Sequence, residues 1–225
     1  MGLVATAILD ALIGDGCAAC RMPGPPLCAS CARSIPMMGP STCARCGHPW
    51  PAVRAVCPQC PPGVAWALQA APYQDPVPAL VTALKDLHRR ALAPPLAQVM
   101  EERMPPPPPG AVLVPIPLAH RRQADRGFNQ AELLARHLGI AWGMPVRPAL
   151  ERRRQAPAQR GAGAPARRRQ VRDAFACTGP PPLHAVLVDD VVTTGSTLSA
   201  AARELRQAGC ARVGAVSLAR VVLPA

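Results

Sequence analysis

Residues 185–197 form the part of this chain whose residue types and spacing are most suited to chemistry. The apolar run Val186–Val188 predicts a short buried strand, and two adjacent aspartates, Asp189 and Asp190, are expected where that strand ends. A loop of small hydroxyl residues comes next, and Leu198–Gln207 predicts a helix with one apolar face. The free N–H groups and the positive dipole at the start of such a helix favour an anion, so this loop could hold a phosphate.

The same segment suggests a ligand with several kinds of polar group. Gly195 would let the backbone approach a phosphate closely, and the neighbouring threonine and serine hydroxyls would add donors. Asp189 and Asp190 could accept hydrogen bonds from vicinal sugar hydroxyls, with a divalent metal nearby to offset charge. This layout fits a phosphate, a ribose and a metal-bound pyrophosphate. The simpler alternative is a strand, loop and helix whose aspartates and threonines only cap the backbone.

At every position this run resembles the phosphoribosyl-pyrophosphate (PRPP) signature of type I phosphoribosyltransferases. The resemblance implies that PRPP or a related phosphoribosyl ligand binds here together with Mg²⁺. The residues expected to bind it are Asp189, Asp190, Val191, Val192, Thr193, Thr194, Gly195, Ser196 and Thr197. Arg121, Arg122 and Arg126 could hold the pyrophosphate oxygens, or they could be ordinary surface charge. No side chain identifies itself as a general base, so the catalytic residues are unknown.

Eight of the ten cysteines lie in the first 60 residues, as four Cys-x-x-Cys pairs. Two pairs supply four thiolates for a tetrahedral zinc ion, so the pattern predicts about two structural zinc ions. The segment has few large apolar residues, and metal would replace the missing core. The expected metal ligands are Cys17, Cys20, Cys28, Cys31, Cys43, Cys46, Cys57 and Cys60. A disulfide framework or an iron–sulfur cluster is the alternative, and the lack of a convincing secretory signal favours zinc.

The sequence leaves open which cysteine pairs share a metal. Neighbouring pairs would give two consecutive ribbons, over residues 17–31 and 43–60, whereas alternate pairs would give a cross-braced arrangement. His48 is a further potential ligand, but four thiolates complete each site, so a loop histidine is the simpler interpretation.

Strand and helix patterns alternate after the cysteine-rich segment. Besides the elements around the acidic pair, they predict strands over 64–71, 111–114 and 212–218, and helices over 76–90, 95–104 and from 126–130 through 138. Such alternation predicts an α/β fold, a parallel sheet with helices on both faces, in which ligands bind at the C-terminal ends of the strands. We expect an N-terminal helix and double zinc ribbon over 1–62, and a type I phosphoribosyltransferase-like domain over 63–225.

Further motifs resemble the ComF family of competence-associated, phosphoribosyltransferase-like proteins. They are Pro115-Ile116-Pro117-Leu118, the run Arg126-Gly127-Phe128-Asn129-Gln130, and Tyr73 ahead of a helix that carries Lys85, together with the cysteine pairs and the PRPP-type run. The resemblance covers nearly the whole chain. It implies a double zinc ribbon joined to a phosphoribosyltransferase domain and a link to uptake of single-stranded DNA in natural transformation.

The segment around Lys85 departs from the family pattern. The family usually has an aromatic residue directly after this lysine and then, two residues later, a glycine. This chain reads Lys85-Asp86-Leu87-His88 instead, so the geometry of this loop is expected to differ.

The formal net charge is +12 and comes almost entirely from arginine, with nine arginines between Arg147 and Arg172. Such a loop could close over a pyrophosphate or contact a nucleic-acid backbone, and it could also be a solvated, mobile run. Arginine enrichment through GC-rich coding is an equally good explanation of the overall charge.

The sequence supports two kinds of function. One is an enzyme that transfers a phosphoribosyl group from PRPP to an unknown acceptor, with a role in DNA uptake. The other is a non-catalytic adaptor that uses the zinc ribbon and the arginine-rich loop to bind single-stranded DNA or a DNA-uptake helicase. The apolar residues 3–13 are too short to span a bilayer, so we expect no membrane insertion and a cytoplasmic protein.

Overall fold

The computed structural model describes residues 16–50, 57–153 and 174–222. The apolar segment 3–13, expected to form an N-terminal helix, lies outside the described residues. Most of the arginine-rich loop, residues 154–172, lies outside them as well.

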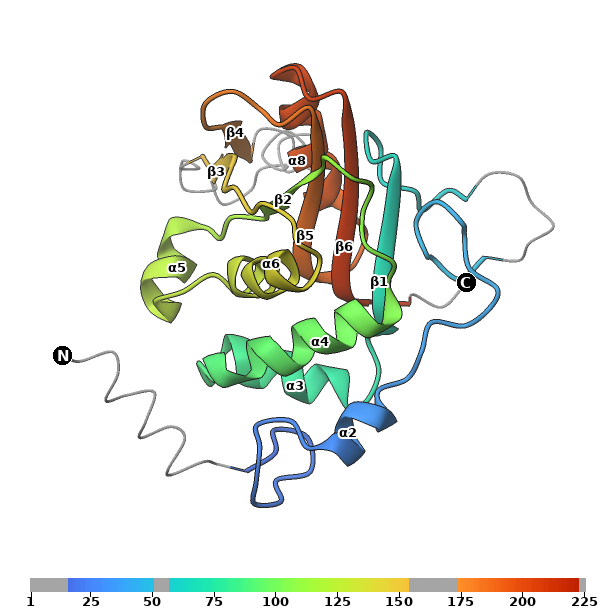
Figure 1. Ribbon diagram of the computed structural model, residues 1–225, viewed down its shortest axis with the longest axis vertical. Coiled ribbons are helices and arrows are strands. Elements are labelled where there is room, and N and C mark those ends of the chain that lie inside the picture. The colour runs from blue at the N-terminus through green and yellow to red at the C-terminus, as the bar shows by residue number, and fades with distance from the viewer. Residues whose placement is uncertain (1–15, 51–56, 154–173, 223–225) are drawn as a thin grey trace, which may run out of the picture.

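A four-stranded sheet forms the centre of the molecule (Figure 1). Its strands are β1 (Trp66–Pro72), β2 (Val112–Pro115), β5 (His184–Val192) and β6 (Arg212–Arg220). They lie in the order β1-β6-β5-β2, and every neighbouring pair is parallel. Because the strands are parallel, their C-terminal ends share one edge of the sheet, where a ligand is expected.

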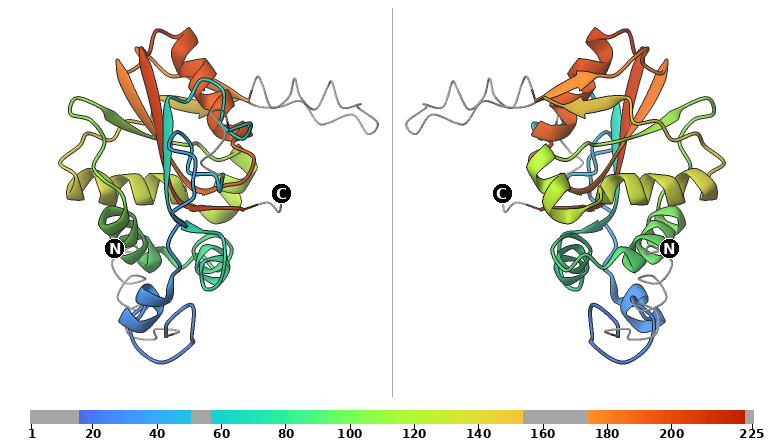
Figure 2. Two further views of the ribbon diagram at one scale, coloured as in Figure 1. Left: turned by 90° about the vertical axis from the view of Figure 1, so that its right-hand side faces the viewer. Right: turned by 90° about the vertical axis from the view of Figure 1, so that its left-hand side faces the viewer.

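Helices cover both faces of this sheet (Figure 2). On one face lie α4 (Ala93–Arg103) and α6 (Gln130–Ala141), while α8 (Ser196–Gln207) packs on the other. The helix α3 (Val77–Lys85) lies beyond the C-terminal end of β1 and shares the core of α4 and α6 (Figure 1). Successive residues of β5 serve alternate faces, since Val186 and Val188 join the first core and Ala185 and Leu187 the second. This arrangement confirms the predicted α/β class with a parallel sheet.

The helix predicted over 76–90 is shorter in the structure, where α3 ends at Lys85 and a 3₁₀ turn, η1, lies over Arg90–Leu92. Leu87, which falls within the predicted helix, is 66% exposed. His88 has a positive φ of 55°, which a continuing α-helix does not allow. The prediction failed here because the chain leaves the helix to contact the segment around Arg126, a tertiary contact that apolar periodicity does not report.

The segment after β2 also differs from the prediction. A separate helix, α5 (His120–Arg126), precedes α6, and Gly127 ends it in the left-handed conformation with a φ of 68°. Asn129 then caps α6, because its side chain accepts a hydrogen bond from the Ala131 N–H at 3.1 Å. The predicted helix start at 126–130 therefore marks the end of one helix and the beginning of the next.

A short antiparallel hairpin, unforeseen in the sequence, lies beside α8. It pairs β3 (Leu150–Arg152) with β4 (Phe175–Cys177). Its buried residues Leu150 and Phe175 belong to the same core as α8. The hairpin thereby brings Arg152 to the face of the sheet that Asp189 serves, whereas Asp190 follows Val186 and Val188 to the other face.

Both cysteine groups of the N-terminal segment are bonded to the rest of the chain. The first cysteine group, with the short helix α2 (Ala29–Ser34), is held by Arg103 of α4, whose guanidinium donates to the carbonyls of Ile35 and Pro36 at 2.9 Å each. The second lies along the edge strand β1, where Ala67 donates its N–H to the Arg45 carbonyl at 2.7 Å.

Candidate ligand and metal sites

Asp189 and Asp190 lie inside β5 rather than after it, which corrects the sequence prediction. Pairing with β6 continues beyond them, through Asp189 opposite Ser217 to Val192 opposite Arg220. Pairing with β2, however, stops at Val188. The acidic pair therefore sits where β5 loses one neighbour, which opens that side of the strand to the loop after β2.

Both carboxylates are held by short local hydrogen bonds. Asp189 Oδ1 accepts from the Asp190 N–H at 2.9 Å, and Asp190 Oδ1 accepts from the Val191 N–H at 2.8 Å. Asp190 is buried and Asp189 is half-buried. The protein around its carboxyl raises the pKa of Asp189 well above its usual range, and the adjacent charge of Asp190 raises it further.

Lys85 completes this acidic centre from another element. Its ammonium lies at the end of α3, 2.5 Å from Asp190 Oδ2. It is the only lysine in the chain. Sequence reasoning noted Lys85 only as a match to the family, because nothing in the linear order shows that residues 85 and 190 meet.

The loop after β5 leads directly into α8. Thr193, Thr194 and Ser196 are exposed, and Gly195, the N-cap residue, makes no side-chain cap. The Thr194 hydroxyl accepts one long hydrogen bond, of 3.4 Å, from the Ser196 N–H. The Thr194 hydroxyl lies 3.1 Å from the Ser196 hydroxyl. Exposed hydroxyls and the remaining free N–H groups of the helix start can donate to a phosphate.

The backbone conformation and the packing at position 195 favour glycine even without a ligand. Its φ is 75°, and a Cβ built on it would lie 2.7 Å from Cγ of Pro61, the residue after Cys60. The second cysteine group therefore packs directly against the candidate phosphate loop.

The arginines proposed for pyrophosphate are distributed over α5. The Arg126 guanidinium is paired with Asp86 at 2.9 Å, so its charge is already partly satisfied. Arg122 is exposed, and the side chain of Arg121 lies outside the described part of the structure.

Arg152, which sequence reasoning missed, lies near the acidic pair. Burial lowers its pKa, the positive charge of Arg122 lowers it further, and the negative charge of Asp189 opposes both effects. Its guanidinium lies 5.1 Å from the centre of the Phe175 ring. In the sequence, Arg152 is one of the nine arginines of the arginine-rich run, and nothing distinguishes it from the other eight.

The run Arg126–Gln130 connects the two loops that flank this edge of the sheet. Asn129 donates to the Ile116 carbonyl at 2.9 Å, in the loop after β2. The buried Phe128 lies under the Arg90 guanidinium at 4.7 Å from its ring centre. The Arg126 carbonyl lies 3.1 Å from His88 Nδ1. This run therefore fixes the segment that carries Lys85 against the loop after β2.

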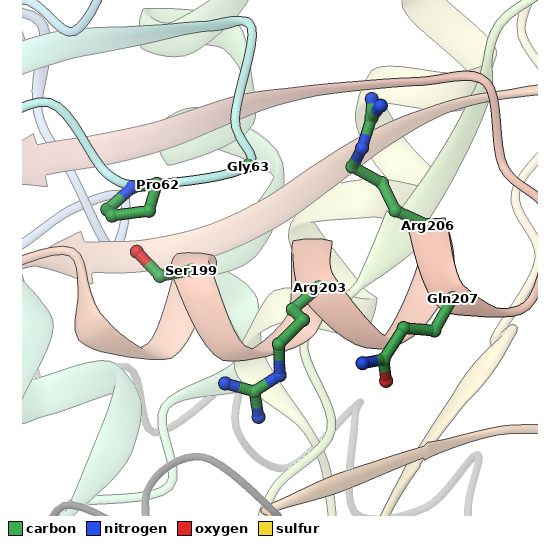
Figure 3. A pocket seen from close by; sticks show the side chains of 6 residues that line it. All are labelled: Pro62, Gly63, Ser199, Arg203, Arg206 and Gln207. Carbon is green, nitrogen blue, oxygen red and sulfur yellow. The ribbon is translucent and has the colours of Figure 1, made fainter.

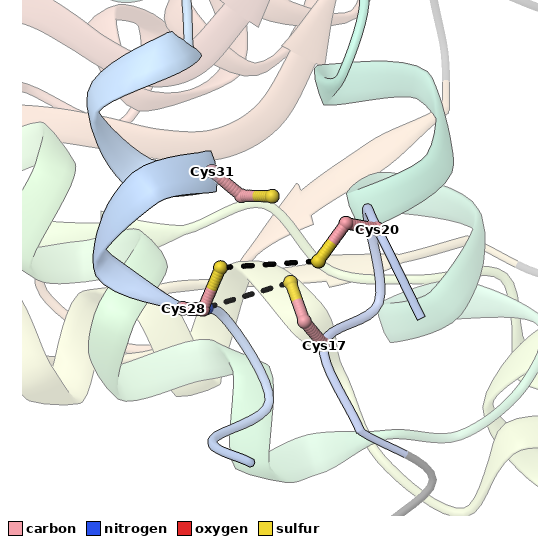
Figure 4. A group of neighbouring side chains, drawn as sticks. All are labelled: Cys17, Cys20, Cys28 and Cys31. Atoms are coloured by element: carbon pink, nitrogen blue, oxygen red, sulfur yellow. Dashed lines mark hydrogen bonds between the residues drawn. The ribbon is translucent and has the colours of Figure 1, made fainter. Parts of the chain in front are cut away.

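The eight N-terminal cysteines gather into two groups made of neighbouring pairs, not alternate ones. Figure 4 shows the first, Cys17, Cys20, Cys28 and Cys31; the second is Cys43, Cys46, Cys57 and Cys60. Within each group all four sulfurs lie within 4.8 Å of one another. His48 belongs to neither group, and all ten cysteines are free thiols rather than disulfides.

The sulfur separations fit a tetrahedral metal. Zinc–sulfur bonds of about 2.3 Å place tetrahedral sulfurs about 3.8 Å apart. The structure gives 3.9 Å for Cys20–Cys28, 3.6 Å for Cys43–Cys60 and 3.8 Å for Cys46–Cys57. Although burial opposes ionisation, backbone N–H groups of Cys20 and Cys28 contribute to lowering the pKa of Cys17 to about 6, whereas hydrogen bonds with the thiols of Cys28 and Cys20 raise the pKa of Cys31 to about 12, so it is the sulfur geometry that supports a metal site.

A buried arginine lies next to the second group. Arg220, at the end of β6, is 1% exposed and donates to the Cys46 carbonyl at 3.3 Å. No carboxylate pairs with it among the residues that the structure describes. Four thiolates with a divalent metal would carry a net negative charge, which would balance this buried cation.

Comparisons with known proteins agree with this architecture. A family model described as a phosphoribosyl transferase domain matches residues 124–221. The DNA utilization protein YhgH of Salmonella typhi is 35% identical over 92% of this chain and 97% of that protein. The protein of the same name in Escherichia coli (strain K12) is 32% identical over the same shares. Competence protein F of Haemophilus influenzae is 37% identical over 48% of this chain and 49% of its own length.

Across the described ranges, no helix is both long and apolar enough to cross a membrane.

Proposed function

The chain belongs to the ComF family, which includes competence protein F and the YhgH DNA utilization proteins, and on this premise we propose that it binds PRPP or a related phosphoribosyl ligand in the use of DNA during uptake. Its proposed ligand loop is the segment 189–197. The observation that carries this proposal is the meeting of three elements at one edge of the sheet: the acidic pair on β5, the start of α8, and Lys85 from α3.

Each part of the ligand has a candidate partner in the described residues. The hydroxyls and N–H groups of Thr193–Thr197 suit the 5′-phosphate. Asp189 and Asp190 suit the ribose hydroxyls, directly or through Mg²⁺, which would supply charge neutralisation when bound. Arg122 and Arg152, with Arg121, are the candidates for the pyrophosphate, whereas Arg126 is engaged by Asp86.

The two cysteine groups are proposed to hold structural zinc. The proposed domain boundary remains at residue 62, with the metal-bearing module before it and the phosphoribosyltransferase-like domain after it. Packing of Pro61 on Gly195 supports a role for the second ribbon in shaping the ligand loop. We further propose that the protein is cytoplasmic. Its proposed partners are single-stranded DNA and a DNA-uptake helicase.

The adaptor alternative receives less support. An adaptor that used only its ribbon and arginine-rich loop would have no need for a salt-bridged acidic pair beside an open helix start. Binding of PRPP or a related phosphoribosyl ligand is therefore the primary proposal. Transfer of the phosphoribosyl group would also require an acceptor substrate.

Calorimetric titration with PRPP tests the proposal. We expect saturable binding in the presence of Mg²⁺, weaker binding without it, and weak binding of ribose 5-phosphate through the loop alone. A parent protein that fails to bind PRPP at millimolar ligand with Mg²⁺ would show that the fold serves another purpose.

A further inference from the structure

Arg220 connects the second cysteine group to the ligand edge of the sheet. Its guanidinium is buried and donates to the carbonyl of Cys46, one of the four cysteines of that group, at 3.3 Å. Its own carbonyl, at the C-terminal end of β6, accepts from the Tyr73 N–H at 2.7 Å. On its other side Arg220 pairs with Val192, the residue directly before Thr193 of the ligand loop. One residue is therefore bonded to the cysteine group and placed between the ends of β1 and β5.

The buried charge of Arg220 lacks a counter-charge from the protein. Its Nε has no hydrogen-bond partner, and no carboxylate pairs with it, among the residues that the structure describes. The adjoining segments 51–56 and 223–225 contain no aspartate or glutamate. An unpaired buried cation is strongly unfavourable. Because four thiolates around a divalent metal have a net negative charge, metal at the second group would stabilise the guanidinium.

A second contact joins the same cysteine group to the same loop. Pro61, which follows the last cysteine of the group, lies where a Cβ on Gly195 would meet its Cγ at 2.7 Å. The chain then runs along α8, since a Cβ on Gly63 would lie 3.6 Å from an alanine Cβ of that helix. Figure 3 shows Pro62 and Gly63 beside α8, at the hollow that they line together. The segment leaving the second group therefore packs on the helix whose start is expected to hold the phosphate.

The first cysteine group is attached elsewhere. Arg103 of α4 holds it in the same way, by donating to the carbonyls of Ile35 and Pro36 at 2.9 Å each. Within the described ranges, no hydrogen bond joins the first group to residues 189–197. The two groups thus provide a comparison, because each is held by an arginine and only one of these arginines lies at the ligand edge.

We propose that metal at the second cysteine group and the phosphoribosyl ligand bind cooperatively, with Arg220 as the positioning residue that couples the two sites, an inference that rests on the proposed function. Without metal, the Cys46 carbonyl and Pro61 would lose their fixed positions, and the guanidinium would lose its counter-charge. The end of β6 and the loop beside it would then rearrange. Because a coupling free energy is shared by both sites, each ligand must raise the affinity for the other by the same factor.

Two full-length double variants isolate the cysteine groups. Cys20→Ser/Cys31→Ser leaves metal only in the second group, and Cys43→Ser/Cys60→Ser leaves it only in the first. Each changes two cysteines that are not fully buried. The measurement is the zinc affinity of each variant, with and without saturating PRPP and Mg²⁺, by competition with a chelator that binds Zn²⁺ but not Mg²⁺.

PRPP should raise the zinc affinity of the variant that keeps the second group by at least about fivefold, the low end of typical coupling. It should not raise that of the variant that keeps the first group, which also controls for zinc bound by PRPP itself. In calorimetry, the variant that keeps the second group should bind PRPP as the parent does. The variant that lacks it should bind PRPP at least about fivefold more weakly.

The role of Arg220 is tested in the variant that keeps the second group. Arg220→Met should abolish the effect of PRPP on zinc affinity, whereas Arg220→Lys, which keeps the charge, should retain it. Arg103→Met, the matched control in the parent background, should leave the PRPP affinity unchanged. If the thermal midpoint shows that Arg220→Met unfolds, Arg220→Gln replaces it.

The possible failures are distinguishable. If the parent binds PRPP but PRPP does not raise zinc affinity at the second group, the coupling is wrong and the proposed function stands. If the effect survives Arg220→Met, the contact of Pro61 carries the coupling and Arg220 is not the positioning residue. If the parent does not bind PRPP, the proposed function fails, and the coupling fails with it.

Discussion

At the scale of single residues, the structure concentrates unfavourable electrostatics at the acidic pair. Two adjacent aspartates lie in one strand, and a single lysine, Lys85, bonds to one of them. The pKa of Asp189 is raised because the surrounding protein partly shields its carboxyl from water and because the charge of Asp190 lies beside it. A ligand or metal that brings positive charge or hydroxyl donors to Asp189 would relieve this, which is the behaviour expected of a binding residue.

The first prediction comes from the raised pKa of Asp189. A carboxyl whose folded-state pKa exceeds its unfolded value favours folding when protonated, and that stability is lost as the pH rises through the folded pKa. Asp189→Asn should therefore raise the thermal midpoint at pH 8 and change it little near pH 4. Asp125→Asn, at an exposed position of α5, is the control and should leave the midpoint nearly unchanged. If Asp189→Asn does not raise the thermal midpoint at pH 8, the raised pKa of Asp189 does not destabilise the folded protein as proposed.

At the scale of elements, the ligand loop depends on the second ribbon. Gly195 and Gly179 share a φ of 75°, yet a Cβ on Gly195 would meet Pro61 at 2.7 Å, whereas nothing lies within 4 Å of one on Gly179. The two positions thus separate backbone strain from a clash with the ribbon.

The second prediction uses this difference. Gly195→Val and Gly179→Val should each lose about 1–3 kcal/mol of stability to positive-φ strain, and Gly195→Val should lose more because of Pro61. Only Gly195→Val should also weaken PRPP binding. Chemical denaturation and calorimetry measure the two effects, and equal stability losses would argue against tight packing between the ribbon and the loop.

Sequence reasoning succeeded at this scale where local pattern decides the element, and failed where distant contacts decide it. The apolar runs around Val186 and Val213 identified buried parallel strands, because both faces of the sheet are covered. The end of α3 at Lys85 was missed because Asp86 and His88 leave the helix to meet Arg126. The hairpin was missed because its strands have three residues each and lie far apart in the sequence, so Arg152 was missed with it.

At the scale of the whole molecule, two cysteine groups stand in for a core that the N-terminal segment lacks. The first group is held against α4 by Arg103. The second group lies along β1, accepts a hydrogen bond from the buried Arg220, and packs on Gly195 through Pro61. Metal at the second group would therefore stabilise the ligand edge of the sheet as well as the ribbon itself.

The third prediction concerns metal content. Elemental analysis of protein purified without added metal should find about two zinc ions per chain. Cys46→Ser should reduce this to about one, whereas Cys177→Ser, outside both groups, should leave two. Iron in place of zinc, or disulfides between the cysteines, would refute the zinc assignment.

The most direct test of the central claim is PRPP binding by the parent and by Asp189→Asn/Asp190→Asn, measured by calorimetry with Mg²⁺. Glu101→Gln/Glu102→Gln on α4 removes the same two charges from an exposed surface and serves as the control. Each lost charge-assisted hydrogen bond is worth about 1.5–3 kcal/mol, so the aspartate variant should bind at least roughly tenfold more weakly while remaining folded. The control should bind as the parent does. An aspartate variant that binds PRPP as tightly as the parent would contradict the account.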